Sequence, residues 1–138
     1  MNEDYVSFET AKLLKEKGFD ENCSRSYVKD KLAVSQGFNN SYYTTMYSDA
    51  SYRPVSAPTL QMAMKWLREK HGLNVYALAV WKDVEIQYGD WEEAVVGYDW
   101  VVESLSYNNS PKTSTGKPFR TYEQACEAGI KYCLENLI

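Results

Sequence analysis

Carboxylates and aromatic side chains gather in one short stretch of the chain. Asp90 and Glu92 flank Trp91, and Tyr88 lies two residues earlier. Glycosidases use two carboxylates on either side of the bond they break, often beside aromatic platforms for the sugar. Asp90 and Glu92 with Trp81, Trp91 and Trp100 could form such a site. A catalytic pair must converge from separate elements, however, and no spacing here demonstrates that. We therefore assign no catalytic residue, and a small hydrolase or carbohydrate-binding protein remains the alternative function.

Two other groups could take part in chemistry. His71 is the one histidine of the chain, and an unperturbed pKa of about 6.5 would suit a general base. It falls in the last turn of an expected helix, where positive charge offsets exposed carbonyl groups, and we interpret it as a capping or solvated residue. The stretch Ser114–Lys117 resembles a phosphate loop, but the first glycine is missing and Pro118 stands where a magnesium-binding hydroxyl should be.

The three cysteines indicate neither a disulfide framework nor a metal site. Cys126 and Cys133 are seven residues apart in one expected helix, which separates their Cα atoms by about 10 Å, too far for a disulfide. One histidine and three scattered cysteines also lack the paired spacing of zinc ligands. We expect Cys126 and Cys133 to be small core residues, and the protein to hold no metal and no cofactor.

Length and charge narrow the class of protein. At 138 residues the chain predicts a single domain over 1–138 with one core. The formal charge of −4 argues against broad binding to phosphate backbones, so nucleic-acid binding through Lys112, Lys117 and Arg120 is disfavoured. The acidic start, Met1–Asp4, has no signal-peptide pattern, and no apolar run approaches the ~20 residues of a membrane span. We expect a soluble cytoplasmic protein.

Three helix starts share one pattern, a hydroxyl residue followed by an apolar residue and then by Glu or Gln. The hydroxyl can accept from free backbone N–H groups of the first turn. The pattern predicts helices from Phe8 to about Lys17, from Leu60 to His71, and from Tyr122 to about the C-terminus. The capping hydroxyls are those of Ser7, Thr59 and Thr121.

Gly129 lies on the apolar face of the third expected helix. A glycine there costs about 1 kcal/mol of helix propensity and is tolerated where another element must approach closely. We therefore expect a strand or a helix to cross at Gly129.

Between the second and third helices the apolar pattern changes to a period of two. It predicts antiparallel strands at Val75–Trp81, Val84–Tyr88 and Tyr98–Leu105. Lys82-Asp83 could be a tight turn or the middle of one long strand, and Gly89-Asp90 is the better turn signal. The stretch Ser106–Pro118, which has almost no apolar residue, is expected to be a long surface loop.

The segment between the first two helices is rich in aromatic and β-branched residues. Tyr42–Tyr47 has strong strand propensity, and Tyr27-Val28 and Tyr52-Arg53 are expected to be short edge pieces. Together these elements predict an α+β fold, with an antiparallel sheet of three to five strands packed against three amphipathic helices.

Aromatic residues are the remaining functional signal. Tyr98, Trp100 and Val102 alternate along one strand and are expected to lie in the core, whereas Tyr88 and Trp91, beside the turn, are better candidates for exposure. Tyr and Trp are enriched among the anchors of protein interfaces. The candidate binding residues are Tyr88, Asp90, Trp91 and Glu92.

Three stretches carry a resemblance to known proteins. Tyr5–Phe19, Ala57–Glu69 and Thr121–Ala125 resemble small uncharacterised proteins common in gut-bacterial genomes and their phages or prophages. The resemblance implies a self-contained accessory protein of a mobile element or its host, with no catalytic residues to carry over. We expect a non-enzymatic protein-interaction module that binds another protein, and a homodimer through a sheet edge or the aromatic patch stays open.

Overall fold

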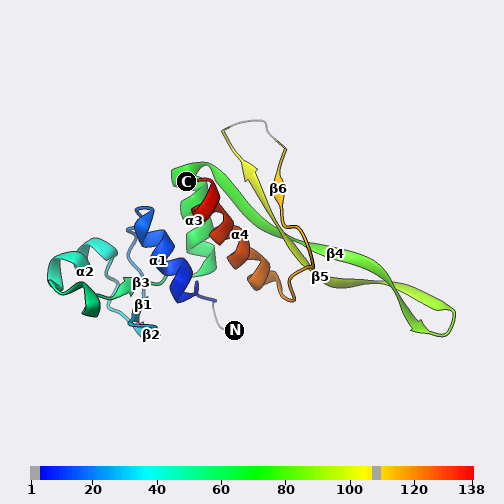
Figure 1. Ribbon diagram of the computed structural model, residues 1–138, viewed down its shortest axis with the longest axis horizontal. Helices are drawn as coiled ribbons and strands as arrows, with labels where there is room; N and C mark the ends of the chain where they lie inside the picture. The colour runs from blue at the N-terminus through cyan, green and yellow to red at the C-terminus, as the bar shows by residue number, and fades with distance from the viewer. Residues whose placement is uncertain (1–3, 107–109) are drawn as a thin grey trace.

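A computed structural model describes residues 4–106 and 110–138; the first three residues of the acidic start and part of the Ser106–Pro118 stretch lie outside them. Within the described residues, four α-helices, a short 3-10 helix and six strands give an α+β fold, as predicted (Figure 1). Among the described residues, no helix combines the length and apolar character needed to cross a lipid bilayer.

In chain order the elements are α1 (Phe8–Glu16), β1 (Arg25–Val28), β2 (Lys31–Val34), α2 (Asn40–Met46), η1 (Ala50–Tyr52), β3 (Val55–Ser56), α3 (Leu60–His71), β4 (Leu73–Gln87), β5 (Asp90–Ser104), β6 (Lys112–Thr113) and α4 (Tyr122–Asn136).

The three predicted helix starts are confirmed. Helices α1, α3 and α4 begin directly after their hydroxyl residues, and each hydroxyl accepts from a backbone N–H of the first turn. At α4 the Gln124 side chain also accepts from the Thr121 N–H, which completes a capping box. Gly72 ends α3 in the left-handed conformation, with φ 63°. Local sequence therefore determines where these helices begin.

The strands form two antiparallel sheets instead of one. Their orders are β2-β1-β3 and β4-β5-β6. Lys82-Asp83 lies in the middle of the long strand β4, and the chain turns at Gly89, whose φ is 82°. Part of the expected surface loop is also a strand, because β6 pairs with β5 at Val101 and Val102.

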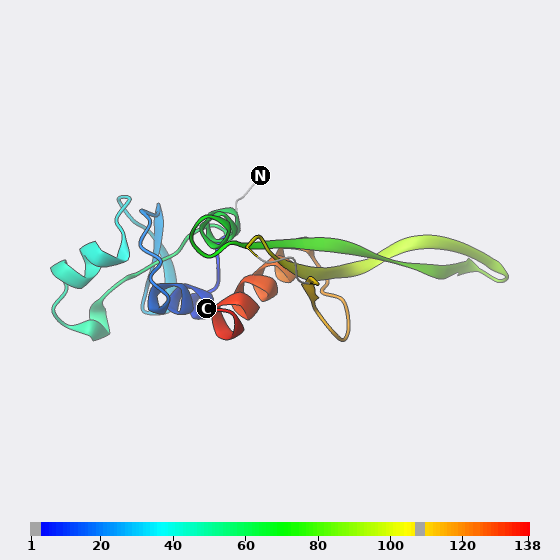
Figure 2. The same cartoon turned by 90° about the horizontal axis from the view of Figure 1, so that it is seen from above.

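The core lies where α4 and α3 pack on the half of the β4–β5 hairpin next to the helices (Figure 2). Gly129 is a point of close approach, since a Cβ placed there would lie 2.8 Å from Val75 Cγ1 and 3.0 Å from Trp100 Cβ. The prediction that another element crosses at Gly129 is confirmed.

The strand predicted over Tyr42–Tyr47 is wrong, because these residues belong mostly to helix α2. The Asn39 side chain caps α2 by accepting from the Tyr42 N–H. Asn40 anchors the helix: its amide donates to Phe19 O at 2.9 Å, and its carbonyl accepts from Ser56 N at 3.0 Å. Cap and anchor outweigh the strand propensity of the tyrosines and threonines.

Of the two short edge strands expected in this segment, the structure contains one. Tyr27-Val28 falls in β1, as predicted. Tyr52 ends the 3-10 helix η1 and Arg53 caps it, so the edge strand expected there is wrong.

Candidate functional site

The outer half of the β4–β5 hairpin projects away from the helices as a twisted two-stranded ribbon (Figure 2). We call residues 81–96 the distal arm. Its β4 side, from Trp81 to Gln87, spans about 20 Å at the usual rise of a strand. Every residue of the distal arm is described, and none is buried. The arm is therefore a ribbon with solvent on both faces.

The arm begins at an irregularity in the hairpin. Val80 pairs with Gly97, but the next residue, Trp81, pairs with Val95, so that Val96 is an extra residue on β5. Bulges of this kind increase the local twist and redirect the strand. The extra residue lies at the junction between the helix-covered part of the hairpin and the arm.

The tryptophans of the hairpin differ in their exposure to solvent. Trp100 is 8% exposed and stacks near Tyr132, with ring centroids 4.6 Å apart. Trp81 and Trp91 are 61% and 63% exposed. The exposure predicted for Tyr88 and Trp91 is confirmed, as is the core position of Trp100.

Register places both exposed tryptophans on one face of the arm. Trp81 pairs with Val95, and Glu85 pairs with Trp91. Trp81 and Glu85 are four residues apart on one strand, so their side chains point to the same side. Trp91 lies directly opposite Glu85 on the paired strand, so its side chain points to that side too. One face of the arm thus presents Trp81 and Trp91 together with carboxylates.

The candidate residues Asp90 and Glu92 do not share that face. They alternate with Trp91 along β5, so their side chains point to the opposite side of the ribbon. Asp90 also accepts a hydrogen bond from Gln87 Nε2 at 2.7 Å. Glu85, on β4, accepts one from the Gly89 N–H at 3.1 Å. The carboxylates of Asp90 and Glu85 therefore help to hold the turn. The structure does not bring Asp90, Glu92 and the Trp91 ring to one side, as a sugar site would require.

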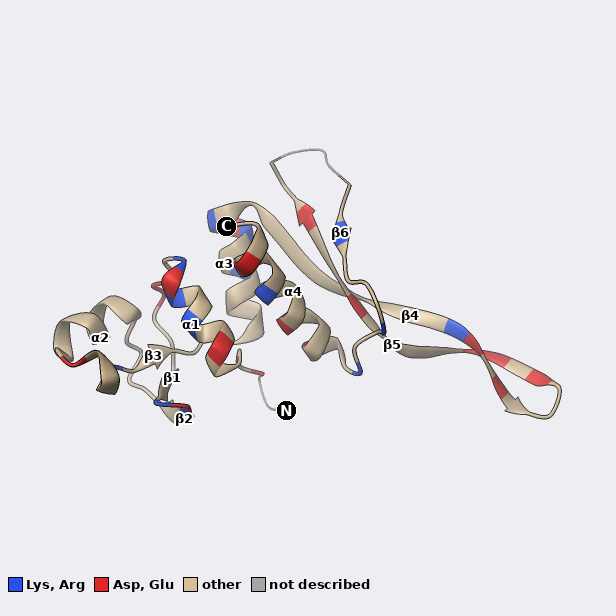
Figure 3. Cartoon of the chain, in the orientation of Figure 1, with Lys and Arg blue, Asp and Glu red and all other residues tan. Residues whose placement is uncertain are grey.

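The distal arm carries the whole excess of acidic over basic residues in the protein (Figure 3). The carboxylates of the arm outnumber its one lysine, Lys82, by four, which equals the formal net charge of −4 for the whole chain. Outside the arm, acidic and basic residues are equal in number. The carboxylates belong to Asp83, Glu85, Asp90, Glu92 and Glu93.

No ion pair among the described residues neutralises the arm carboxylates. Asp83 and Glu93 lie directly opposite each other across the ribbon, an arrangement that destabilises a hairpin. The ion pairs found among the described residues lie on the helices: Lys65 with Glu69, and Lys131 with Glu9 and Glu135. The arm carboxylates are consequently available to a cationic partner.

The remaining candidates for chemistry have structural roles. The His71 ring packs edge-on against Trp66, with centroids 4.7 Å apart, at the end of α3. The three cysteines are buried and free, and burial raises the pKa of Cys23 and Cys133 to about 12. The core position predicted for Cys126 and Cys133 is confirmed. Within residues 4–106 and 110–138, no three His, Cys, Asp or Glu side chains are grouped to hold a metal ion.

A groove of about 630 Å³ lies between the N-terminal segment and α4. None of the candidate binding residues predicted from the sequence lines it. It runs past Tyr5, Thr10, Phe119 and Ala128. Glu127, on its wall, already accepts from the Ser7 N–H at 2.9 Å, and Lys131 on its rim is paired with Glu9. These two contacts join the start of α1 to α4, while the other carboxylate oxygen of Glu127, Oε2, is buried without a hydrogen-bond partner among the described residues. We rank the distal arm above this groove because the arm exposes large aromatic side chains to solvent.

Comparison of the chain with protein-family models, with curated proteins and with solved structures finds no match, so the site is interpreted from its own residues.

Proposed function

We propose that the protein is a non-enzymatic protein-interaction module and that the distal arm is its binding surface. The observation that carries the proposal is the exposure of Trp81, Ile86, Tyr88 and Trp91 on a ribbon with no second layer. A two-stranded hairpin is marginally stable in water on its own, and solvent-exposed apolar groups of this size are typical of interaction surfaces. Trp and Tyr are also the residues that most often anchor an interface.

The charge of the arm defines the kind of partner. Five carboxylates with one lysine favour a protein whose contact surface carries Lys or Arg around an apolar patch. Such complementarity speeds association and makes it sensitive to salt. We propose an accessory role of this kind, in which the helical body presents the arm to a host or phage protein.

The sugar-binding alternative receives less support. Its aromatic platform, Trp91, and its carboxylates, Asp90 and Glu92, point to opposite faces of the ribbon. Glycosidase carboxylates instead flank one bond from two sides of a cleft. We therefore retain the interaction module alone.

Affinity capture tests the proposal. Tagged protein is incubated with lysate of its native cell, and the bound proteins are identified by mass spectrometry for the wild type, Trp81→Ala and Trp91→Ala. The matched control is Met46→Ala, which removes an exposed apolar side chain from α2 at the other end of the molecule. We expect a partner that is retained by the control, lost by both tryptophan variants and released by high salt.

Thermal melting of the same variants separates binding from folding. Because Trp81 and Trp91 are exposed, both variants should melt close to the wild type. Equal capture by all four proteins, or a large loss of thermal stability in Trp91→Ala, would contradict the proposal.

A further inference from the structure

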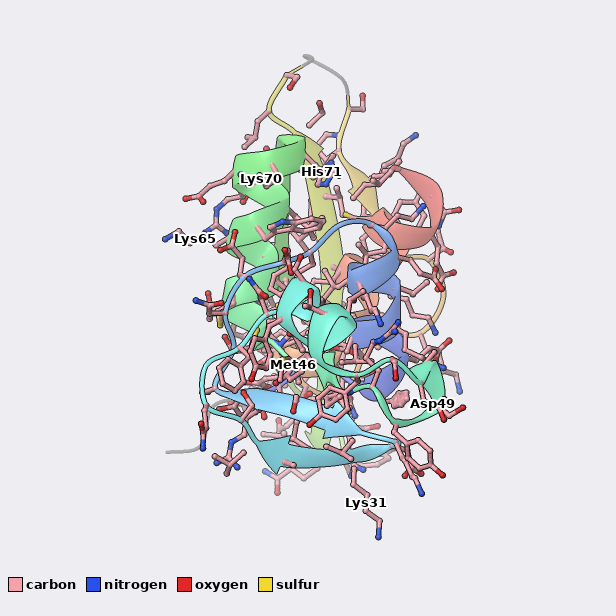
Figure 4. All side chains as sticks on the ribbon, turned by 90° about the vertical axis from the view of Figure 1, so that its left-hand side faces the viewer. Lys31, Met46, Asp49, Lys65, Lys70 and His71 are labelled. Carbon is pink, nitrogen blue, oxygen red and sulfur yellow. The ribbon has the colours of Figure 1, made fainter. Side chains whose placement is uncertain are left out.

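The β1–β2 hairpin has the opposite charge to the distal arm. We call residues 25–34 the basic hairpin. Arg25, Lys29 and Lys31 outnumber its one carboxylate, Asp30, by two. Figure 4 shows Lys31 projecting from β2 away from the body of the molecule. Lys29 and Lys31 are exposed, with Lys29 Nζ 5.8 Å from the centroid of the Tyr52 ring, whereas Arg25 is half-buried and lies over the Tyr5 ring. The hairpin therefore presents its positive charge to solvent chiefly through the two lysines.

The tip of the basic hairpin is unusual for its backbone. Lys29 has φ 61°, a left-handed conformation in which Gly or Asn is the ordinary choice at a tight turn. Among the described residues it is the one non-glycine residue with a positive φ. A lysine is thus held at this turn although the backbone does not favour it.

Exposed apolar side chains lie on the face of β2 opposite Lys31. Leu32 and Val34 lie on one face of β2, and Val34 is 74% exposed. In the part of the chain that the structure describes, β2 is also an edge strand, since the order of its sheet is β2-β1-β3. An exposed edge strand with apolar side chains can accept a strand from another chain.

The basic hairpin and the distal arm lie on opposite sides of the helical body (Figures 1 and 2). The arm extends away from β2, so the two cannot meet within one molecule. Contact between two arms would bring like charges of −4 together, which opposes a symmetric dimer through the arms. The complementary contact joins one end of a molecule to the other end of the next.

We propose that a second copy of this chain occupies the distal arm, with the arm of one molecule docked on the basic hairpin of the next. This inference rests on the proposed function, because it names the partner of the same arm. With a strand of the arm paired edge to edge with β2, Trp81 and Trp91 lie beside Leu32 and Val34 on one face of the joint sheet. Asp90 and Glu92 then lie on the other face, on the same side as Lys31. A head-to-tail contact of this kind produces open chains or closed rings.

The contact is small, which sets the conditions of the test. A few strand residues on each side bury less than the about 1,200 Å² of a standard interface, so association should be weak and salt-sensitive. The assay is therefore sedimentation velocity from micromolar to millimolar protein, at low and at high salt. We expect a mass that rises beyond the dimer with concentration and falls with salt.

Two variants each disable one end. Lys29→Gln with Lys31→Gln removes positive charge from the basic hairpin, and Trp81→Ala with Trp91→Ala removes the apolar anchors of the arm. We expect the lysine variant to weaken association about tenfold and the tryptophan variant to abolish it. Mixed together, the two variants retain one complementary contact and should form heterodimers that do not grow.

Lys65→Gln with Lys70→Gln is the matched control. It makes the same change of charge on α3, away from the basic hairpin (Figure 4), and should assemble like the wild type. Melting curves of all variants establish that they fold.

The outcomes distinguish this inference from the proposed function. A protein that stays monomeric at every concentration, yet loses a lysate partner in Trp91→Ala, overturns self-docking and leaves the interaction module intact. A monomer without any partner overturns both. Assembly that is lost in the tryptophan variant but unchanged in the Lys29 and Lys31 variant indicates a contact between arms and overturns the head-to-tail arrangement.

Discussion

Substitution of Gly129 by alanine tests how α4 holds the hairpin that carries the distal arm. The added Cβ would meet Val75 Cγ1 at 2.8 Å and Trp100 Cβ at 3.0 Å, so the helix must move away from the sheet. Overpacking of this kind costs about 1–3 kcal/mol. Alanine recovers about 1 kcal/mol of helix propensity. We therefore expect a net loss of about 1 kcal/mol, which corresponds to a fall of about 2–5 °C in the melting temperature.

A double-mutant cycle shows whether the contact is the cause. Val75→Ala removes Cγ1 and opens space at the crossing, at the expense of a small cavity. The penalty of Gly129→Ala, measured by urea unfolding, should be smaller in the Val75→Ala background than in the wild type. An unchanged or raised stability of Gly129→Ala, or a penalty that is the same in both backgrounds, would refute the close approach of α4 to the hairpin.

Two further predictions concern buried groups. Asn40→Ala leaves Phe19 O and Ser56 N without their buried partner and should lower the free energy of unfolding by about 2–3 kcal/mol in urea titrations; a loss below about 0.5 kcal/mol would mean that α2 does not depend on this anchor. Because burial raises the pKa of Cys23 and Cys133 to about 12, both remain protonated thiols at pH 8. A thiol-reactive dye should label them only after unfolding, and prompt labelling of the native protein would contradict their burial.

Local signals in the sequence account for the helices and the main turn. Ser7, Thr59 and Thr121 cap helices at the predicted positions because a hydroxyl and the N–H groups it satisfies lie within one turn of each other. Gly89 marks the hairpin turn for a similar reason, since few other residues adopt its φ of 82° without strain. Each of these features depends only on residues close together in the chain.

Helix α2 shows where local reasoning fails. The tyrosines and threonines of residues 42–47 favour a strand, and the hydrogen bonds of Asn40 to Phe19 and Ser56 favour the helix. The partners of Asn40 lie 21 and 16 residues away along the chain. No local pattern indicates that they meet.

For the candidate site too, some features follow from the sequence and others only from the tertiary structure. The sequence by itself determined the acidic and aromatic composition around Trp91 and the exposure expected beside a turn. It could not determine where the helices stop along the hairpin. Trp100 and Trp81 are the same residue type on paired strands, yet one is buried under α4 and the other lies in solvent, because α4 covers only the near half of the ribbon. Burial depends on what packs against a strand, and only the tertiary structure decides that.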